Sequence, residues 1–209
     1  MSIDTTPRRR LREHESPLRG DARFIALLAT AERLLDEGRF DDASITEIAR
    51  AADISRPTFY FYFASKQALL NSLLSRTLED LTAGLRKRLE DPDVTPTEAI
   101  RTSLEAMADL WFDHRPALMA AVAIGATEPA IFDQMALANH TITDVAARHL
   151  VAGRNVSTQS EARELGRTLG WMSERSFYVL VREQPSRKEL RELADRLLVI
   201  WTNAAGLED

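Results

Sequence analysis

The hydrophobic positions of this chain recur every three or four residues along most of its length. That period places them on one face of an α-helix, so it predicts a chain built of amphipathic helices. A first helix is expected to start at residue 21 and stop at Gly38, and a long one to span residues 65 to about 90. Leucines mark the stripe of the long helix: Leu70, Leu73, Leu74, Leu78, Leu81, Leu85 and Leu89.

Prolines and capping residues divide the rest of the chain into further helices. Ser44 with Glu47 three residues later has the spacing of a capping box, which predicts a short second helix. The other predicted helices are residues 97–114, a short apolar segment from Pro116, a segment from Pro129 to about residue 152, residues 163–182 and residues 187–205. With one more in the segment after Asp53, the helices number about nine, and the predicted fold class is all-α.

The segment after Asp53 reads "SRPTFYFYFASK" (residues 55–66), with five aromatic residues that alternate between Phe and Tyr. Alternation is typical of a strand, but an isolated strand among helices would leave its backbone groups unpaired. Ser55 can cap a helix and Pro57 is tolerated in a first turn, so a short helix is predicted instead. Helical geometry gives it two faces: Phe59, Tyr62 and Phe63 on one side, and Pro57, Thr58, Tyr60 and Phe61 on the other.

The outward aromatic face of this short helix indicates a binding role, because exposed aromatic surface is unusual. Such a helix suits the DNA major groove, where hydroxyls bond phosphate oxygens and an apolar ring contacts a thymine methyl. Asp53 supplies the turn after the preceding helix. Lys66 stands at the start of the next helix, where its ammonium and the helix dipole both favour a phosphate. The pattern therefore predicts a helix-turn-helix.

Composition excludes several classes of protein and is compatible with a helix-turn-helix. The 209 residues are 44% hydrophobic, enough for a core, and show no apolar run that would span a membrane or direct secretion, so the cytoplasm is expected. Without cysteine, disulfides, thiolate metal sites and thiol nucleophiles are excluded. A net charge of −5 argues against a general polyanion binder. Residues 1–20 nevertheless form a predicted flexible basic arm with Arg8, Arg9, Arg10 and Arg12.

The stretch "SITEIARAADISRPTFYFYFASKQALL" (residues 44–70) resembles the DNA-binding signature of the TetR family of transcriptional regulators. The resemblance is strong over about residues 21–75. It is greatest to the ethionamide-resistance-repressor branch, and it continues weakly to "MSERSF" and "EQPS" near the C-terminus. One departure is Asp53, where the family commonly has Gly. Because Asp tolerates the left-handed conformation better than most residues, the turn is expected to survive.

The resemblance implies three regions and a set of DNA contacts. The regions are the arm at residues 1–20, a helix-turn-helix domain at residues 21–66, and a ligand-binding and dimerisation domain at residues 67–209. Beside a helix-turn-helix, the arm arginines are expected to enter the adjacent minor groove. The residues implied at the DNA, apart from those arginines, are Ser44, Thr46, Arg56, Pro57, Thr58, Tyr60, Phe61, Tyr62 and Lys66.

For the C-terminal region the resemblance implies an inducer cavity and a homodimer. Aromatic, methionine and small residues could line an apolar cavity in the bundle, although each alone is better explained as plain core. The implied pocket residues are Leu104, Met107, Trp111, Met135, Asn139, Gly170, Ser173, Phe177, Tyr178 and Trp201. Because that branch has asparagines where this chain has Gly170 and Ser173, the lipophilic effector is expected to depend less on amide hydrogen bonds.

The last two helices are expected to pair with a second copy as a four-helix interface. Two recognition helices about one DNA turn apart would then read a palindromic operator in double-stranded DNA. The residues predicted for this interface are Leu165, Leu169, Leu190, Leu193 and Leu197.

Enzymatic interpretations are weak, and no cofactor is expected. His14, His114, His140 and His149 lack metal-ligand spacing, and there is no phosphate-binding glycine loop. Asp109, Asp113 and His114 could form a metal cluster, but a solvated helix end explains them better. Two alternatives stay open. One is a helical small-molecule binder or enzyme with a vestigial helix-turn-helix, and the other is a TetR-type regulator that activates transcription or responds to a protein rather than a small molecule.

Overall fold

The structure is a computed structural model that describes residues 21–89 and 94–207, except for the side chains of residues 80, 81 and 84–89. Within these residues the chain forms nine α-helices and no strand, which confirms the predicted all-α class. The helices are α1 (Ala22–Asp36), α2 (Ile45–Ala51), α3 (Arg56–Tyr62), α4 (Lys66–Leu89), α5 (Pro96–Asp113), α6 (Arg115–Gly125), α7 (Pro129–Leu150), α8 (Gln159–Val181) and α9 (Arg187–Ala205).

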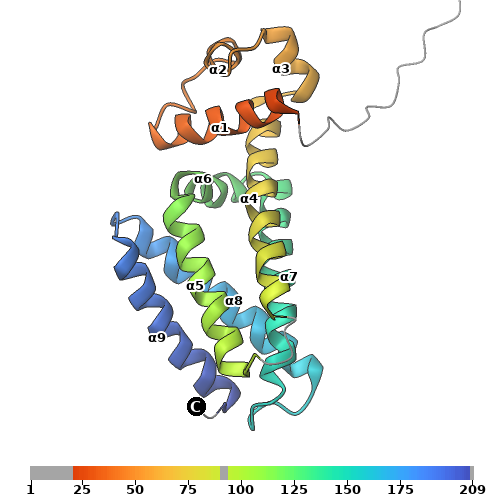
Figure 1. Cartoon of the computed structure of the whole chain (residues 1–209), viewed down its shortest axis with the longest axis vertical. Coiled ribbons are helices and arrows are strands. Elements are labelled where there is room, and N and C mark those ends of the chain that lie inside the picture. The colour runs from red at the N-terminus through yellow and green to blue at the C-terminus, as the bar shows by residue number, and fades with distance from the viewer. Residues whose placement is uncertain (1–20, 90–93, 208–209) are drawn as a thin grey trace, which may run out of the picture.

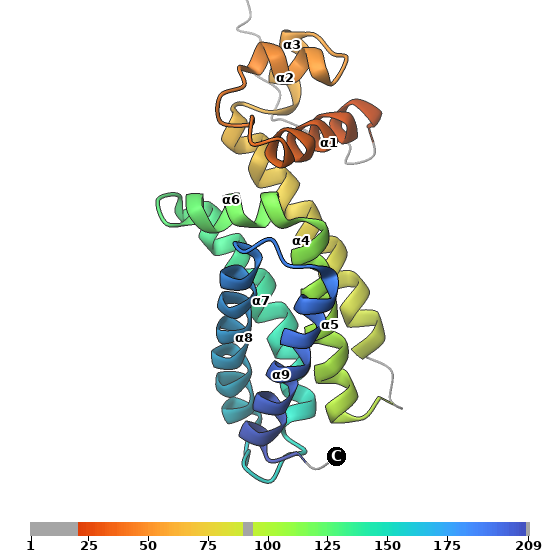
Figure 2. The same cartoon turned by 90° about the vertical axis from the view of Figure 1, so that its left-hand side faces the viewer.

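The helices form two parts joined by the long helix α4. Helices α1 to α3 gather at one end of the molecule, and α4 runs from them along the side of a bundle (Figure 1). In that bundle α5 packs against α9, and α7 packs against both α8 and α4. Helix α6 crosses between the two parts, where it packs against α1 (Figure 2). The small part is therefore coupled to the bundle through α1, α4 and α6.

Side-chain caps set the start of most of these helices. The capping box predicted at Ser44 is formed, because Ser44 Oγ accepts from the Glu47 N–H and the Glu47 carboxylate accepts from the Ser44 N–H. Helix α8 begins at Gln159, four residues before the predicted start, because Thr158 Oγ1 accepts from the Glu161 N–H. The predicted start rested on the hydrophobic period alone, which begins after this cap.

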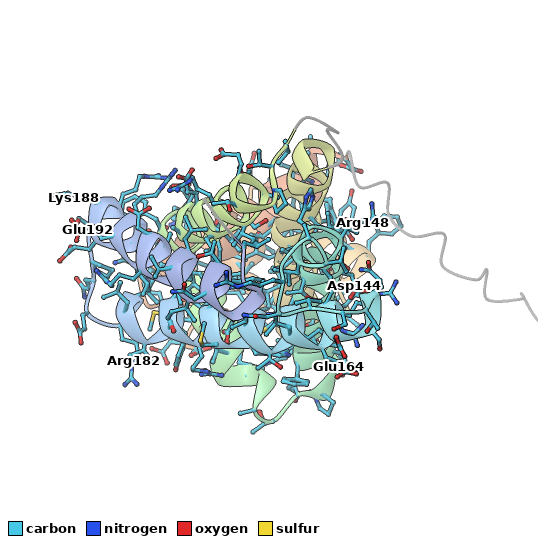
Figure 3. All side chains as sticks on the ribbon, turned by 90° about the horizontal axis from the view of Figure 1, so that it is seen from below. Asp144, Arg148, Glu164, Arg182, Lys188 and Glu192 are labelled. Atoms are coloured by element: carbon cyan, nitrogen blue, oxygen red, sulfur yellow. The ribbon has the colours of Figure 1, made fainter. Side chains whose placement is uncertain are left out.

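Each part has its own hydrophobic core. The core of the small part centres on α1 and the aromatic segment, and extends to α6 and the start of α7. The bundle core lies between α5, α7, α8 and α9 and includes Leu104, Trp111, Leu150, Phe177 and Trp201. Seen from below, the labelled charged side chains of α7, α8 and α9, and that of Arg182 directly after α8, stand on the outside of the bundle (Figure 3). In the described ranges, no helix combines the length and the apolar character that a bilayer crossing needs.

Candidate nucleic-acid interface and effector cavity

The aromatic segment is a helix, as predicted, and not a strand. Ser55 Oγ accepts from the Thr58 N–H at 3.2 Å, and Pro57 stands in the first turn of α3, where no donor is required. The turn between α2 and α3 places Asp53 at φ 54°, in the left-handed region. The expected tolerance of Asp at this position is confirmed, and α3 follows α2 as the second helix of a helix-turn-helix.

Two of the five aromatic rings anchor α3 on the core. Phe59 is 0% exposed and Phe63 3% exposed, and the Phe63 ring lies 5.3 Å from the Phe24 ring between centroids. The opposite face is open, with Tyr60 45% and Phe61 64% exposed. The division into an inward and an outward face is confirmed, so the helix presents an aromatic surface that its own chain does not cover.

A cation and a phenol stand together on the exposed face of α3. The Arg56 guanidinium donates to the Tyr60 hydroxyl at 3.5 Å and lies 5.6 Å from the centre of that ring. Pro57 is exposed beside them, while Thr58 Oγ1 shares a 2.7 Å hydrogen bond with Ser55 Oγ. Arginine and hydroxyl groups are the usual donors to phosphate oxygens and base edges. Apart from Tyr62, the predicted residues of this helix therefore lie away from the buried Phe59, with chemistry that suits DNA.

Tyr62 differs from the other predicted contacts because its hydroxyl is used inside the protein. It donates to a carboxylate oxygen of Asp21, the residue that caps α1 by accepting from the Arg23 N–H. The bond from Tyr62, followed by that from Arg23, lowers the pKa of Asp21. The same bond raises the pKa of Tyr62. Tyr62 thus links the end of α3 to the start of α1, a role that the sequence pattern did not predict.

Lys66 also has partners within the chain. Its ammonium donates to the carbonyl oxygens of Asp41 and Ala43, both at 2.8 Å, and lies 5.2 Å from the centre of the Phe40 ring. These bonds hold the loop before α2, where Ser44 and Thr46 are exposed. An ammonium has three donors, so one is left for a phosphate. The arm residues Arg8, Arg9, Arg10 and Arg12 lie outside the described residues.

The bundle encloses a cavity of about 20 Å³, room for one water molecule. Four of the predicted pocket residues line it: Leu104, Met107, Gly170 and Trp201. Ser173 lies beside it, because Ser173 Oγ accepts from the Trp201 indole at 3.0 Å and donates to the Leu169 carbonyl oxygen. Five further lining residues are inward residues of α5 and α7. Sequence reasoning missed four of them, Ile100, Ser103, Ile142 and Ala146, and the fifth is Thr143.

The other predicted pocket residues lie around the bundle without lining this cavity. Phe177 is 0% exposed, and Trp111 pairs edge-on with Tyr178 at 6.2 Å between ring centroids. Met135 packs against the core of the small part. Asn139 is buried against Gly170, where a Cβ atom would come within 2.8 Å of Asn139 Oδ1. Glycine is therefore required at position 170 for α7 and α8 to approach so closely.

Two buried polar side chains near this contact have oxygens without a hydrogen-bond partner in the described part of the chain: Asn139 Oδ1 and both carboxyl oxygens of Glu174. Glu174 stands one helical turn after Gly170 on α8 and is 8% exposed. Burial raises the pKa of Glu174, and Arg175, at 3.8 Å, counters only part of that effect. The sequence signal was available, because Glu174 interrupts the buried stripe of α8.

The residues predicted for dimerisation lie mostly in the core of their own chain. Leu169, Leu190 and Leu197 are 6%, 0% and 3% exposed, and Leu165 and Leu193 are half-buried against the same core. The prediction treated one apolar stripe as free, whereas that stripe faces the bundle. The large apolar side chains that α8 and α9 expose are different ones: Val179, Val199 and Ile200.

The acidic end of α5 is an ion-pair network. Arg187 contacts both Asp109 and Asp113, and Arg191 contacts Asp109. The His114 imidazole bonds Glu32 of α1 at 2.6 Å. The described residues contain no group of three or more His, Asp or Glu arranged to hold a metal ion. The metal reading of Asp109, Asp113 and His114 therefore has no geometric support in this part of the molecule.

Comparison with known proteins agrees with the geometry of α2 and α3. The family model described as "Bacterial regulatory proteins, tetR family" matches residues 27–73. The HTH-type transcriptional regulator EthR of Mycobacterium tuberculosis is 34% identical over 190 residues, which is 88% of each chain. EthR of Mycolicibacterium smegmatis is 29% identical over 202 residues, covering 95% of this chain and 92% of the relative.

A solved structure shows the same architecture at lower identity. The transcriptional regulator FadR of Bacillus subtilis, in complex with stearoyl-CoA, superimposes with a TM-score of 0.71 at 13% identity over 87% of this chain and 98% of its own. The helix-turn-helix, the matched segment and the relatives that span most of the chain agree with one another. This chain therefore belongs to the TetR family of bacterial transcriptional regulators.

Proposed function

We propose that this chain represses transcription by binding operator DNA through α3 and is released by a small lipophilic effector held in the C-terminal bundle. The observation that carries the proposal is the open face of α3. Arg56, Tyr60 and Phe61 are exposed there, while Phe59 and Phe63 fix the helix to the core. The face offers donors for phosphates and bases and a ring for a thymine methyl.

The bundle supports the effector half of the proposal. It has an apolar interior with two buried polar groups, Asn139 and Glu174, that have oxygens accepting no hydrogen bond from the described residues. Such groups are costly unless something bonds them. An effector with an apolar body and one polar group that can bond them would relieve that cost. FadR of Bacillus subtilis was solved in complex with stearoyl-CoA, whose stearoyl chain is apolar.

Release follows if the effector binds one arrangement of the bundle better than another. The cavity of about 20 Å³ is too small for an organic molecule, so an occupant would have to move α5, α7 or α8 apart. Since α4 packs on α7 and continues into the small part, such a movement would reposition α3. The loss of operator affinity equals the differential affinity of the effector for the two arrangements.

The proposed partners follow from the geometry of operators. A single short helix reads few base pairs, and two copies related by a two-fold axis would read a palindrome. The exposed Val179, Val199 and Ile200 of α8 and α9 are candidates for the interface between the copies. A regulator that binds chromosomal DNA acts where that DNA lies, which in bacteria is the cytoplasm.

The direct test is binding of the full chain to labelled DNA from upstream of its own gene. We expect a sequence-specific complex that weakens steeply between 50 mM and 200 mM salt, and that dissociates when a screen of lipophilic molecules reaches the effector. A complex that competitor DNA of random sequence removes completely would favour a small-molecule binder with a vestigial helix-turn-helix.

An activator is the second candidate. The transcriptional activator FasR of Mycolicibacterium smegmatis is 29% identical over 127 residues, which is 60% of this chain. Deletion of the gene distinguishes repression from activation. Transcripts of the controlled genes should rise in the deletion strain if the protein represses, and fall if it activates.

A further inference from the structure

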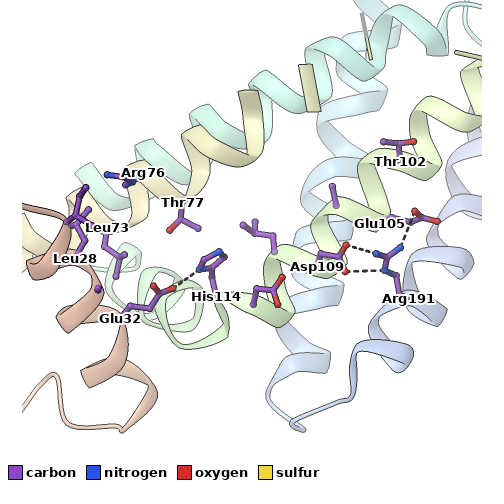
Figure 4. A pocket seen from close by; sticks show the side chains of 15 residues that line it. Leu28, Glu32, Leu73, Arg76, Thr77, Thr102, Glu105, Asp109, His114 and Arg191 are labelled. Carbon is purple, nitrogen blue, oxygen red and sulfur yellow. Dashed lines mark hydrogen bonds and ion pairs between the residues drawn. The ribbon is translucent and has the colours of Figure 1, made fainter. Parts of the chain in front are cut away.

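A cleft of about 480 Å³ opens between α1, α4, α5 and α9, away from the bundle cavity (Figure 4). Its volume lies within the range of small-molecule sites. Residues of α1 form one wall and residues of α5 and α9 the opposite wall, with α4 between them. The cleft therefore separates the helix-turn-helix part from the bundle.

Apolar side chains form the inner surface of this cleft. Ile25 and Leu28 of α1, Leu73 of α4 and Leu110 of α5 all line it. Ile25 is 41% exposed, which is high for a side chain of its size and type. A site with this lining favours a ligand with an apolar body, because such a body would remove that surface from water.

The charged side chains of the cleft carry more negative than positive charge. Its lining contains four carboxylates and two guanidinium groups: Glu32, Glu105, Asp109 and Asp113 against Arg76 and Arg191. Arg187 approaches Asp109 and Asp113 from outside the lining and still leaves one carboxylate in excess. Asp109 is engaged at both oxygens by Arg187 and Arg191. Glu105 is paired with Arg191 and Asp113 with Arg187, so the excess falls on Glu32.

Glu32 is the carboxylate best placed to meet a ligand. It stands on α1 at the edge of the apolar wall, and one of its oxygens bonds His114 Nδ1 at 2.6 Å across the cleft (Figure 4). The imidazole is charged only when protonated. A neutral imidazole would leave the negative charge of Glu32 uncompensated by this contact, and a carboxylate accepts more than one hydrogen bond.

We propose that this cleft is a second small-molecule site, which takes an organic ammonium ion with an apolar body. The body lies against Ile25, Leu28 and Leu110, and the ammonium donates to Glu32. The excess of carboxylates disfavours an anion of the same shape. An occupant would touch α1 and α5 together, so it would brace the helix-turn-helix part against the bundle.

Three probes with the same body test the charge selectivity: 4-phenylbutylamine, 4-phenyl-1-butanol and 4-phenylbutyrate. Calorimetric titration of the full chain without DNA keeps this result independent of the proposed repressor function. We expect the amine to bind about tenfold more tightly than the alcohol, the worth of one charge-assisted hydrogen bond, and the carboxylate to bind weakest. Equal affinities, or tightest binding of the carboxylate, would overturn the proposal.

Variants test the location. Glu32→Gln keeps a hydrogen-bonding group beside His114 and removes the charge, so it should weaken the amine about tenfold and leave the alcohol unchanged. Ala29→Phe, at an exposed position of α1 that lines the cleft, should weaken both. Glu98→Gln, an exposed carboxylate on α5 outside the cleft lining, is the matched control and should change neither.

Circular dichroism checks that each variant is folded. If Ala29→Phe is not, Thr102→Phe narrows the cleft from the opposite wall on α5. Amine binding that is insensitive to Glu32→Gln and to the narrowing variant would place the ligand elsewhere, for example in the bundle, and would refute the cleft as its site.

Discussion

The helix-turn-helix and the bundle differ in whether their polar side chains are hydrogen-bonded within the chain. In the helix-turn-helix the polar side chains at helix ends have partners within the chain: Ser44 with Glu47, Ser55 with Thr58, and Tyr62 with Asp21. In the bundle, Asn139 Oδ1 and the Glu174 carboxyl oxygens are buried and accept no hydrogen bond from the described residues. The polar side chains at these helix ends are therefore hydrogen-bonded within the chain, whereas the interior of the bundle contains buried oxygens that are not.

This difference matches what the two regions are proposed to do. A DNA-reading helix must hold its side chains in place before it meets the operator, because ordering them on binding costs affinity. A receptor interior can keep unbonded polar groups, since the ligand bonds them and the stability lost in the free protein returns on binding. Substitutions in either region test whether this difference exists.

The largest effect is expected at the anchor of α3. Phe59→Ala removes a ring that is 0% exposed, and the cavity should lower the free energy of unfolding by about 3–5 kcal/mol. Phe61→Ala, on the exposed face of the same helix, should change it by less than about 0.5 kcal/mol. Urea unfolding followed by circular dichroism measures both. Similar losses for the two variants would contradict the division of α3 into an anchoring and a reading face.

Replacement of the buried carboxyl of Glu174, which accepts no hydrogen bond from the described residues, should instead stabilise the protein. Glu174→Met keeps the length of the side chain and removes a buried polar group, so it should stabilise the protein by about 1–3 kcal/mol at pH 7. Glu164→Met, at an exposed position of the same helix, is the control. A less stable Glu174→Met protein would show that the carboxyl has a partner in the native state.

The same variant carries a pH signature. Burial raises the pKa of Glu174 in the folded chain, so the unfolded chain ionises first as the pH rises and the wild type loses stability above about pH 4. Below that pH both states are protonated. The difference in unfolding free energy between Glu174→Met and the wild type should therefore grow between about pH 4 and pH 7. A difference that does not change with pH would contradict the burial of an ionisable group.

Sequence patterns predicted the helices better than the uses of their faces. The period of three and four residues, with caps such as Ser44 and Ser55, was sufficient to place α1 to α4, because these signals are local. Helix α8 was placed four residues late because its cap at Thr158 precedes the hydrophobic stripe. The positions of these helices could thus be predicted from the hydrophobic period and the capping residues within each segment.

Site residues were harder to predict because their roles depend on partners far away in the sequence. Tyr62 and Asp21 are 41 positions apart, and Lys66 bonds carbonyls 23 and 25 positions earlier. The leucine row of α9 was assigned to a dimer because an apolar stripe does not show which neighbour covers it. Glu174 falls within the buried stripe of α8, but only the packing of the helices shows that its carboxyl oxygens accept no hydrogen bond from the described residues.

A smaller effect is expected at the open face of α3. Tyr60→Phe removes a hydroxyl proposed to bond a phosphate, and should weaken operator binding by about 1 kcal/mol, or about fivefold in Kd. Its melting temperature should stay near that of the wild type, because Tyr60 is 45% exposed. Fluorescence anisotropy with labelled operator measures the affinity. Unchanged affinity would remove the Tyr60 hydroxyl from the proposed contacts.

The smallest effect distinguishes Tyr62 from Tyr60. Tyr62→Phe removes the bond to Asp21 that lowers the pKa of this carboxyl, so its main effect should be a lower melting temperature. A depressed carboxyl pKa stabilises the fold above the ordinary Asp value and loses this contribution as the pH falls through the folded pKa. The difference in melting temperature between wild type and Tyr62→Phe should therefore be full at pH 7 and shrink toward pH 3. Equal melting temperatures at pH 7, with a loss of operator affinity as large as that of Tyr60→Phe, would assign the Tyr62 hydroxyl to the DNA rather than to α1.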